Sequence, residues 1–100
     1  MAKRIVWSLQ ASEQKKDILS YWYQRNKSLE YPRKLNNLLI SAINLIAEYS
    51  YPRVLTDIDG VHVKIVRDYK IFYQEDSFCI YIISIWDTRQ DPEHLKTILT

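Results

Sequence analysis

The spacing of apolar residues changes near Tyr51–Pro52, and this change limits the folds that the chain can adopt. Before this point, apolar residues recur every three or four positions, which predicts amphipathic helices. After it, β-branched and aromatic residues gather in short runs that are typical of strands. Helices followed by a group of sequential strands favour an α+β fold over an alternating α/β fold.

Two helices are predicted before the change. The first runs from Ser12 to about Asn26 and has an apolar face formed by Ile18, Leu19 and Trp22. Ser28 is a candidate cap for the second, which contains Pro32 early, where a first helical turn tolerates proline. The apolar face of the second helix is formed by Leu35, Leu38, Leu39, Ala42, Ile43, Leu45, Ile46 and Tyr49. Tyr51–Pro52 is expected to end this helix, because the residue before a proline is pushed away from helical angles. The two helices should form a hairpin.

Four runs of strand-forming residues are predicted to build a sheet: Lys3 to Ser8, His62 to Val66, Tyr69 to Gln74 and Phe78 to Trp86. Short polar turns separate the last three, which indicates an antiparallel meander. The first strand should lie at a sheet edge or beside the last strand, and the last strand, apolar on both faces, should be central. Asp91–Pro92 should begin a short C-terminal helix.

Residues 1–100 are therefore expected to form one two-layer α+β domain. In this domain the N-terminal strand and the helical hairpin pack on a mainly antiparallel four-stranded sheet. A hydrophobic content of 47% with one Gly and three Pro excludes a disordered chain.

The residues that could hold metals or disulfides are sparse. Cys79 stands alone, so it cannot form an internal disulfide, and no Cys or His pairs have zinc-site spacing. We expect no metal and no cofactor, and we interpret Cys79 as a small buried hydrophobic residue. No window approaches the length of a membrane span, so we expect no membrane contact and a cytoplasmic location.

Four stretches resemble the RelE/ParE superfamily of small bacterial toxins, and together they cover nearly the whole chain. They are RIVWSLQASEQKKDIL, the helical pair, GVHVKIVRDYKIFYQ from Gly60 to Gln74, and IYIISIWDTRQDP from Ile80 to Pro92. The resemblance implies a toxin of a type II toxin-antitoxin system, a class linked to plasmid stabilisation. It also implies a cognate antitoxin with a helix or strand in the toxin groove. A homodimer or a heterotetramer with the antitoxin would fit.

Two growth-inhibiting activities occur in this superfamily: ribosome-dependent cleavage of messenger RNA and poisoning of DNA gyrase. A ribonuclease must activate a 2′-hydroxyl and stabilise charge on phosphorus, which basic side chains and a general acid or base can do. The resemblance places Lys70 and His94 near catalytic positions of cleaving members, and Lys64 and Arg89 complete the candidate catalytic set. Alternatively, Lys64 and Lys70 are solvated side chains and Arg89 forms a salt bridge within its turn.

The acidic residues around Arg89 argue against the ribonuclease, because Asp87, Asp91 and Glu93 would repel a phosphate. The sequence therefore favours ParE-like inhibition of gyrase over a RelE-like messenger RNA endoribonuclease. A non-toxic module that binds only the antitoxin is a further alternative. Candidates for target or partner binding are Trp22, Tyr23, Arg67, Trp86, Arg89 and Gln90.

Overall fold

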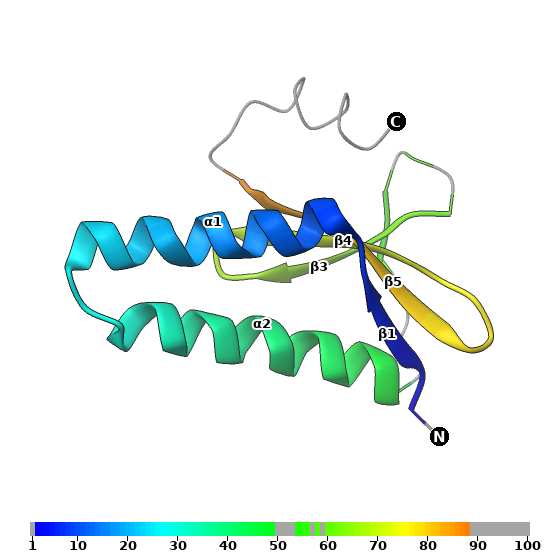
Figure 1. Cartoon of the computed structure of the whole chain (residues 1–100). Coiled ribbons are helices and arrows are strands. Elements are labelled where there is room, and N and C mark those ends of the chain that lie inside the picture. The colour runs from blue at the N-terminus through cyan, green and yellow to red at the C-terminus, as the bar shows by residue number, and fades with distance from the viewer. Residues whose placement is uncertain (1, 50–53, 57, 59, 89–100) are drawn as a thin grey trace.

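A computed structural model describes residues 2–49, 54–56, 58 and 60–88 of the chain (Figure 1). The elements are β1 (Arg4–Trp7), α1 (Leu9–Asn26), α2 (Glu30–Glu48), β2 (Val54–Leu55), β3 (His62–Val66), β4 (Tyr69–Glu75) and β5 (Cys79–Asp87). The two helices run side by side as a hairpin and pack on the sheet, which confirms the predicted two-layer α+β class. The C-terminal helix predicted from Asp91–Pro92 lies outside the described residues.

The strand order in the sheet is β1-β5-β4-β3-β2. β1 is parallel to β5, and the other neighbours are antiparallel. The two placements predicted for the first strand both hold, since β1 is an edge strand and lies beside β5. β5 is an interior strand between β1 and β4, and β4 is the middle strand of the five. β2 adds a fifth strand to the four that the sequence predicted, because two residues are too few to produce an alternating pattern.

α1 begins at Leu9, three residues before the predicted start at Ser12. The correction has a clear physical cause. The Ser8 hydroxyl accepts a hydrogen bond from the Ala11 amide at 2.9 Å, which is the standard role of an N-cap serine. The helix ends at Asn26 as predicted, and Lys27 takes left-handed backbone angles (φ 53°) as its C-cap.

α2 also differs slightly from its predicted bounds. Its N-cap is Leu29, without a side-chain cap hydrogen bond, so the prediction of Ser28 as the cap is wrong by one residue. The Ser28 hydroxyl precedes the cap and accepts from the Glu30 amide at 3.2 Å. The helix ends at Glu48, before the predicted stop at Tyr51–Pro52, because Tyr49 has extended backbone angles. Near this end, the Lys3 amide donates to the Ala47 carbonyl at 2.9 Å, so the N-terminal segment satisfies one of the last helical carbonyls.

The sheet carries apolar residues on both faces. On the helix side, α2 contributes Leu35, Leu39 and Ile43, which are nearly inaccessible and pack with the larger core cluster of β4 and β5. On the other face, Val61, Phe72 and Trp86 form a second, smaller cluster. Neither described helix has both the length and the apolar character that a membrane crossing requires.

Candidate functional site

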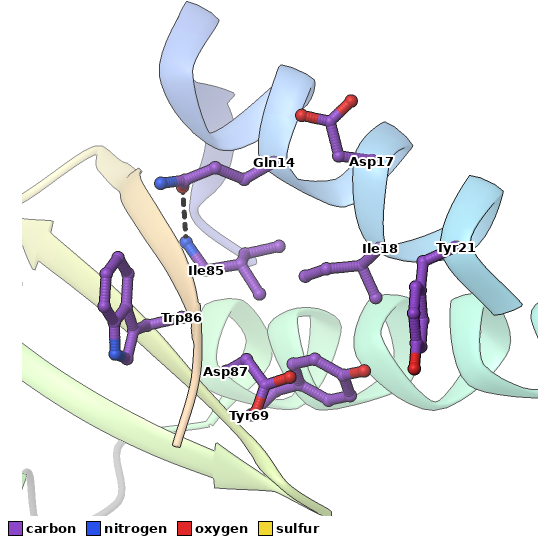
Figure 2. A pocket seen from close by; sticks show the side chains of 8 residues that line it. All are labelled: Gln14, Asp17, Ile18, Tyr21, Tyr69, Ile85, Trp86 and Asp87. Atoms are coloured by element: carbon purple, nitrogen blue, oxygen red, sulfur yellow. Dashed lines mark hydrogen bonds between the residues drawn. The ribbon is translucent and has the colours of Figure 1, made fainter. Parts of the chain in front are cut away.

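A cleft of about 450 Å³ lies between α1 and the end of β5 (Figure 2). Its lining residues come from three elements: Gln14, Asp17, Ile18 and Tyr21 of α1, Tyr69 of β4, and Ile85, Trp86 and Asp87 of β5. The four residues of α1 are spaced as i, i+3, i+4 and i+7, so one helical face forms one wall of the cleft. We call it the α1–β5 cleft.

A β-bulge in β5 shapes this cleft. Phe72 of β4 pairs with Ser84 and Tyr73 pairs with Ile82, so Ile83 is an extra residue in the ladder. At the bulge β5 has passed the end of β1, and α1 takes over the hydrogen bonding. The Ser8 hydroxyl donates to the Ile83 carbonyl at 2.8 Å.

The Gln14 side chain also accepts hydrogen bonds from the part of β5 that lies beyond the end of β1. Its Oε1 accepts from the Ile85 amide at 2.9 Å and from the Ser84 hydroxyl at 3.0 Å, and Figure 2 shows the first of these bonds. Ser84 and Ile85 are buried, so both donors would lose hydration without this acceptor. Gln14 therefore fixes the distance between α1 and the strand that forms the opposite wall.

Aromatic side chains hold the far end of the cleft. The indole nitrogen of Trp22 donates to the Tyr69 hydroxyl at 2.7 Å. The Trp22 ring also makes edge-on contacts with Tyr21 and Tyr31, at centroid distances of 5.2 and 4.9 Å. These contacts are of the geometry that aromatic pairs prefer. Trp22, which the sequence suggested as a binding residue, thus has a structural role here.

The described residues that line the α1–β5 cleft carry charges of one sign. Asp17 on α1 and Asp87 on β5 are its charged lining residues, and no Lys or Arg belongs to the described lining. Two carboxylates in one partly enclosed space attract a cation and oppose a phosphate. Within the described parts of the chain, no group of three or more His, Cys, Asp or Glu is placed to hold a metal ion.

The structure does not bring Lys64 and Lys70 together. Lys64 pairs with Ile71, whose side chain belongs to the helix-side core, whereas Lys70 pairs with Trp86 in the second cluster. Paired residues share a face, so the two lysines lie on opposite faces of the sheet. They cannot contact one phosphate from these positions.

The other predicted site residues are dispersed. Trp86 is buried, at 5% exposure, while Tyr23 is 43% exposed on α1. Arg67 is exposed in the β3–β4 turn, with left-handed backbone angles (φ 58°) that few residues other than glycine adopt. Arg89, Gln90 and His94 lie outside the described residues. Gln14 and Asp17 were not among the predicted site residues, although their helical spacing with Ile18 and Tyr21 places all four on one face of α1.

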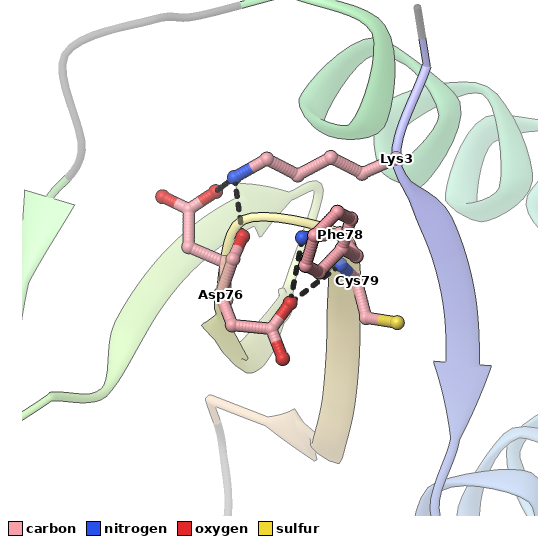
Figure 3. A network of polar contacts seen from close by, with 5 residues as sticks. Lys3, Asp76, Phe78 and Cys79 are labelled. Atoms are coloured by element: carbon pink, nitrogen blue, oxygen red, sulfur yellow. Dashed lines mark hydrogen bonds and ion pairs between the residues drawn. The ribbon is translucent and has the colours of Figure 1, made fainter.

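A second polar network organises the β4–β5 hairpin (Figure 3). The Asp76 carboxylate accepts hydrogen bonds from the Phe78 and Cys79 amides and from the Tyr81 hydroxyl, at 2.8, 2.7 and 2.9 Å. The two amide bonds and then the hydroxyl bond stabilise the charged form and lower the pKa of Asp76. The same hydroxyl bond raises the pKa of Tyr81 to about 12.

Lys3 connects this network to β1. Its ammonium group lies 3.0 Å from the Glu75 carboxylate and donates to the Asp76 carbonyl at 2.7 Å. Phe78 sits at the tip with 80% of its surface exposed. These contacts fix the turn and join it to the N-terminal segment, so we assign the network to the shape of the hairpin and to its position beside β1.

Comparison with known proteins identifies a family model and solved structures that this chain resembles. The family model described as the ParE toxin of the type II toxin-antitoxin system parDE matches residues 5–92. A solved chromosomal ParDE TA system from P. aeruginosa has a similar fold, with a TM-score of 0.70 and 13% identity over 84% of this chain and 94% of that one. A YoeB dimer from Staphylococcus aureus matches with a TM-score of 0.47 and 24% identity, over 84% and 94% of the respective chains. No curated protein sequence matches the chain.

Proposed function

Because the chain belongs to the ParE toxin family of type II toxin-antitoxin systems, we propose that it is a toxin that inhibits DNA gyrase and that a cognate antitoxin neutralises. The family match over residues 5–92 carries the proposal. The resemblance of the four sequence stretches to the RelE/ParE superfamily supports the same class of toxin. It does not distinguish gyrase from messenger RNA as the target, so this choice depends on individual residues.

The placement of cationic side chains supports gyrase inhibition over RNA cleavage. A ribonuclease needs several basic groups that converge on one phosphate. Lys64 and Lys70 project from opposite faces of the sheet, and the α1–β5 cleft presents Asp17 and Asp87. A toxin that binds a protein target has no need of a converging cationic site.

We assign the α1–β5 cleft to the antitoxin. Its aromatic and aliphatic walls suit an apolar side chain, and the exposed Asp17 carboxylate suits a Lys or Arg on the same segment. Reversal of charge in Asp17→Lys and Asp87→Lys should weaken the complex with the antitoxin encoded beside this chain. Glu13→Lys, an exposed change on α1 outside the lining, is the matched control. Equal affinity of all three variants in a pull-down titration would exclude the cleft as the antitoxin site.

The target can be tested by inducing the chain without its antitoxin in a bacterial host. Plasmid supercoiling, gyrase-linked DNA breaks and messenger RNA integrity are then followed in the same cells. We expect growth arrest with lost supercoiling or DNA breaks and with intact RNA. Codon-phased RNA cleavage with normal supercoiling would replace this proposal with the endoribonuclease.

A folding-defective variant provides the control for the induction experiment. Leu39 is fully buried in the core, so Leu39→Asp places a charge there and should unfold the chain. Arrest by this variant would attribute the effect to protein overproduction. Absence of arrest by the folded wild-type chain would favour the non-toxic antitoxin-binding module.

A further inference from the structure

The end of the helical hairpin at which α1 joins α2 is basic. α1 ends at Asn26 and α2 begins at Glu30, so three residues connect them, and Figure 1 shows that this end extends past the strands of the sheet. Within residues 21–34 the sequence has four cations and one carboxylate: Arg25, Lys27, Arg33, Lys34 and Glu30. The whole chain has a net charge of only +2, so positive charge is concentrated here. We call residues 21–34 the basic tip.

The positive charges of the basic tip are exposed and are not neutralised by neighbouring carboxylates. None of the ion pairs among the described residues includes a cation of the tip. The Arg25 guanidinium donates to the Tyr21 hydroxyl at 3.3 Å, and the Lys27 ammonium donates to the Gln24 side-chain oxygen at 3.2 Å. Both acceptors are uncharged. The field of the cations therefore remains available to a ligand in solvent.

The positions of Arg33 and Lys34 are not explained by helix stability. Both lie within the first five residues of α2, where the helix dipole favours carboxylates and disfavours cations. The N-cap residue, Leu29, provides no side-chain hydrogen bond to the first amides. A bound anion would interact favourably with the two cations and also with this end of the helix.

Arg25 and Lys34 lie on one surface of the basic tip, because two aromatic rings connect them. The guanidinium carbon of Arg25 is 6.0 Å from the centre of the Trp22 ring, and this ring packs edge-on against Tyr31 at 4.9 Å. Tyr31 and Lys34 are three residues apart on α2, so they share a helical face. A recess of about 350 Å³ lies beside them and is lined by Asn26, Ser28, Glu30, Tyr31 and Lys34.

The recess presents groups of the kinds that contact phosphate oxygens. Asn26 offers an amide N–H, and Lys34 offers an ammonium group. The Ser28 oxygen accepts from the Glu30 amide at 3.2 Å, so its own O–H can donate outward. Glu30 would repel a phosphate, but the cations of the basic tip outnumber it.

We propose that the basic tip binds the phosphate backbone of duplex DNA without reading the base sequence. Arg25 and Lys34 would each contact a phosphate, and Lys27 would add a third cation at the connection. Two helix ends joined by three residues present no helical face to the major groove, so we expect backbone contacts and no base readout. The inference goes beyond the proposed function, because it concerns a nucleic acid and can fail while that function stands.

Two observations favour duplex DNA over other anionic partners. The phosphates of a duplex form a dense array of charge, which suits cations spread over the tip better than one acidic side chain does. A single strand is usually held by stacking of its bases on aromatic rings. The rings of Trp22 and Tyr31 pack on the core cluster and against each other, so they do not form a stacking platform.

Fluorescence anisotropy with two labelled duplexes of unrelated sequence tests the proposal on the purified full chain. We expect equal affinity for the two duplexes. The logarithm of affinity should fall against the logarithm of salt concentration with a slope of about −3, one unit for each of three phosphate contacts. Arg25→Gln, Lys27→Gln and Lys34→Gln combined should bring the slope near zero and weaken binding at about 50 mM salt roughly tenfold or more. An unchanged slope would overturn the proposal.

A second triple variant provides the matched control. Arg4→Gln, Lys16→Gln and Lys64→Gln remove the same positive charge from exposed positions outside the basic tip. This variant should keep the wild-type affinity and salt slope. Equal weakening by the two triple variants would mean that the net charge of the chain, and not the basic tip, determines binding. Circular dichroism melting of both variants shows that each is folded, since all the substituted side chains are exposed.

Competition against the labelled duplex tests the class of ligand. Unlabelled duplex DNA should displace it at a lower concentration than polyglutamate or single-stranded RNA does. Stronger competition by polyglutamate would make the basic tip a site for an acidic protein, and stronger competition by RNA would make it an RNA site. Either result would overturn the proposal. Amide chemical-shift changes on addition of the duplex should gather in residues 21–34, and changes confined to the strands would also overturn it.

Discussion

The indole of Trp22 and the phenol of Tyr69 are joined by a hydrogen bond of 2.7 Å that ties α1 to β4. Tyr69 is 2% exposed, so water cannot readily replace the indole as donor. The bond also holds the Tyr69 side chain in place, and this side chain forms part of the lining of the α1–β5 cleft. The bond therefore contributes both to the stability of the helical hairpin and to the shape of the candidate site.

Trp22→Phe and Tyr69→Phe should each lower the free energy of unfolding, by about 1–3 kcal/mol. The double variant should lose less than the sum of the two, because the second substitution removes a partner that is already missing. Urea unfolding of the four proteins measures the difference. Strict additivity would mean that the bond contributes no coupling between α1 and β4.

Gln14→Met should destabilise the chain by about 1–3 kcal/mol, because it leaves the buried Ile85 amide and Ser84 hydroxyl without their acceptor. Gln14→Glu is the matched control, since it keeps an acceptor oxygen at a similar reach. Thermal unfolding and amide hydrogen exchange at Ile85 provide the measurement. A Met variant with wild-type exchange at Ile85 would show that another group satisfies this amide.

The acid limb of stability should depend on Asp76. Its pKa is lowered in the folded chain, so the folded state binds fewer protons than the unfolded state below the ordinary value of 3.8. The stabilisation is therefore present above that value and is lost as pH falls through the folded pKa. Asp76→Asn should flatten the dependence of melting temperature on pH between about 2 and 5. An unchanged slope would assign the acid sensitivity to other carboxyl groups.

The alkaline counterpart concerns Tyr81. Its raised pKa of about 12 means that the neutral phenol is stabilised by its bond to Asp76; this contribution is present below the ordinary value of 10.0 and is lost as pH rises through about 12. Tyrosinate absorbance should show a late step that disappears in Tyr81→Phe. In Asp76→Asn this step should move toward 10.0. A late step that persists in Tyr81→Phe would belong to another tyrosine.

The fold was largely predictable because its signals are local and periodic. Helical spacing identified the buried face of α2, including Leu35, Leu39 and Ile43, and continuous apolar character identified β5 as an interior strand. The start of α1 directly after Ser8, and not at Ser12, could not be predicted from the neighbouring residues alone. Ser8 caps α1 and also donates to the Ile83 carbonyl, a contact between segments that are far apart in the sequence.

The candidate site was less predictable, for two reasons. The β5 bulge at Ile83 leaves no trace in a run of apolar residues, so the role of Gln14 as its acceptor could not be inferred. The placement of Lys64 and Lys70 on opposite faces of the sheet, in contrast, could have been predicted from the sequence. The two-residue turn at Arg67–Asp68 pairs Val66 with Tyr69, and counting outward from it places the two lysines on opposite faces.

The parallel pairing of β1 with β5 has a consequence for how the chain folds during synthesis. The Arg4 amide donates to the Phe78 carbonyl, and Trp7 lies in register with Ile82. The first strand of the sheet can therefore pair only after β5, which lies far later in the sequence, has been synthesised. Contacts of such long sequence separation form slowly. On a translating ribosome the helical hairpin and the β3–β4 hairpin can emerge early, but β1 remains without its partner until β5 has left the exit tunnel. Completion of the fold is thereby coupled to completion of translation through β5.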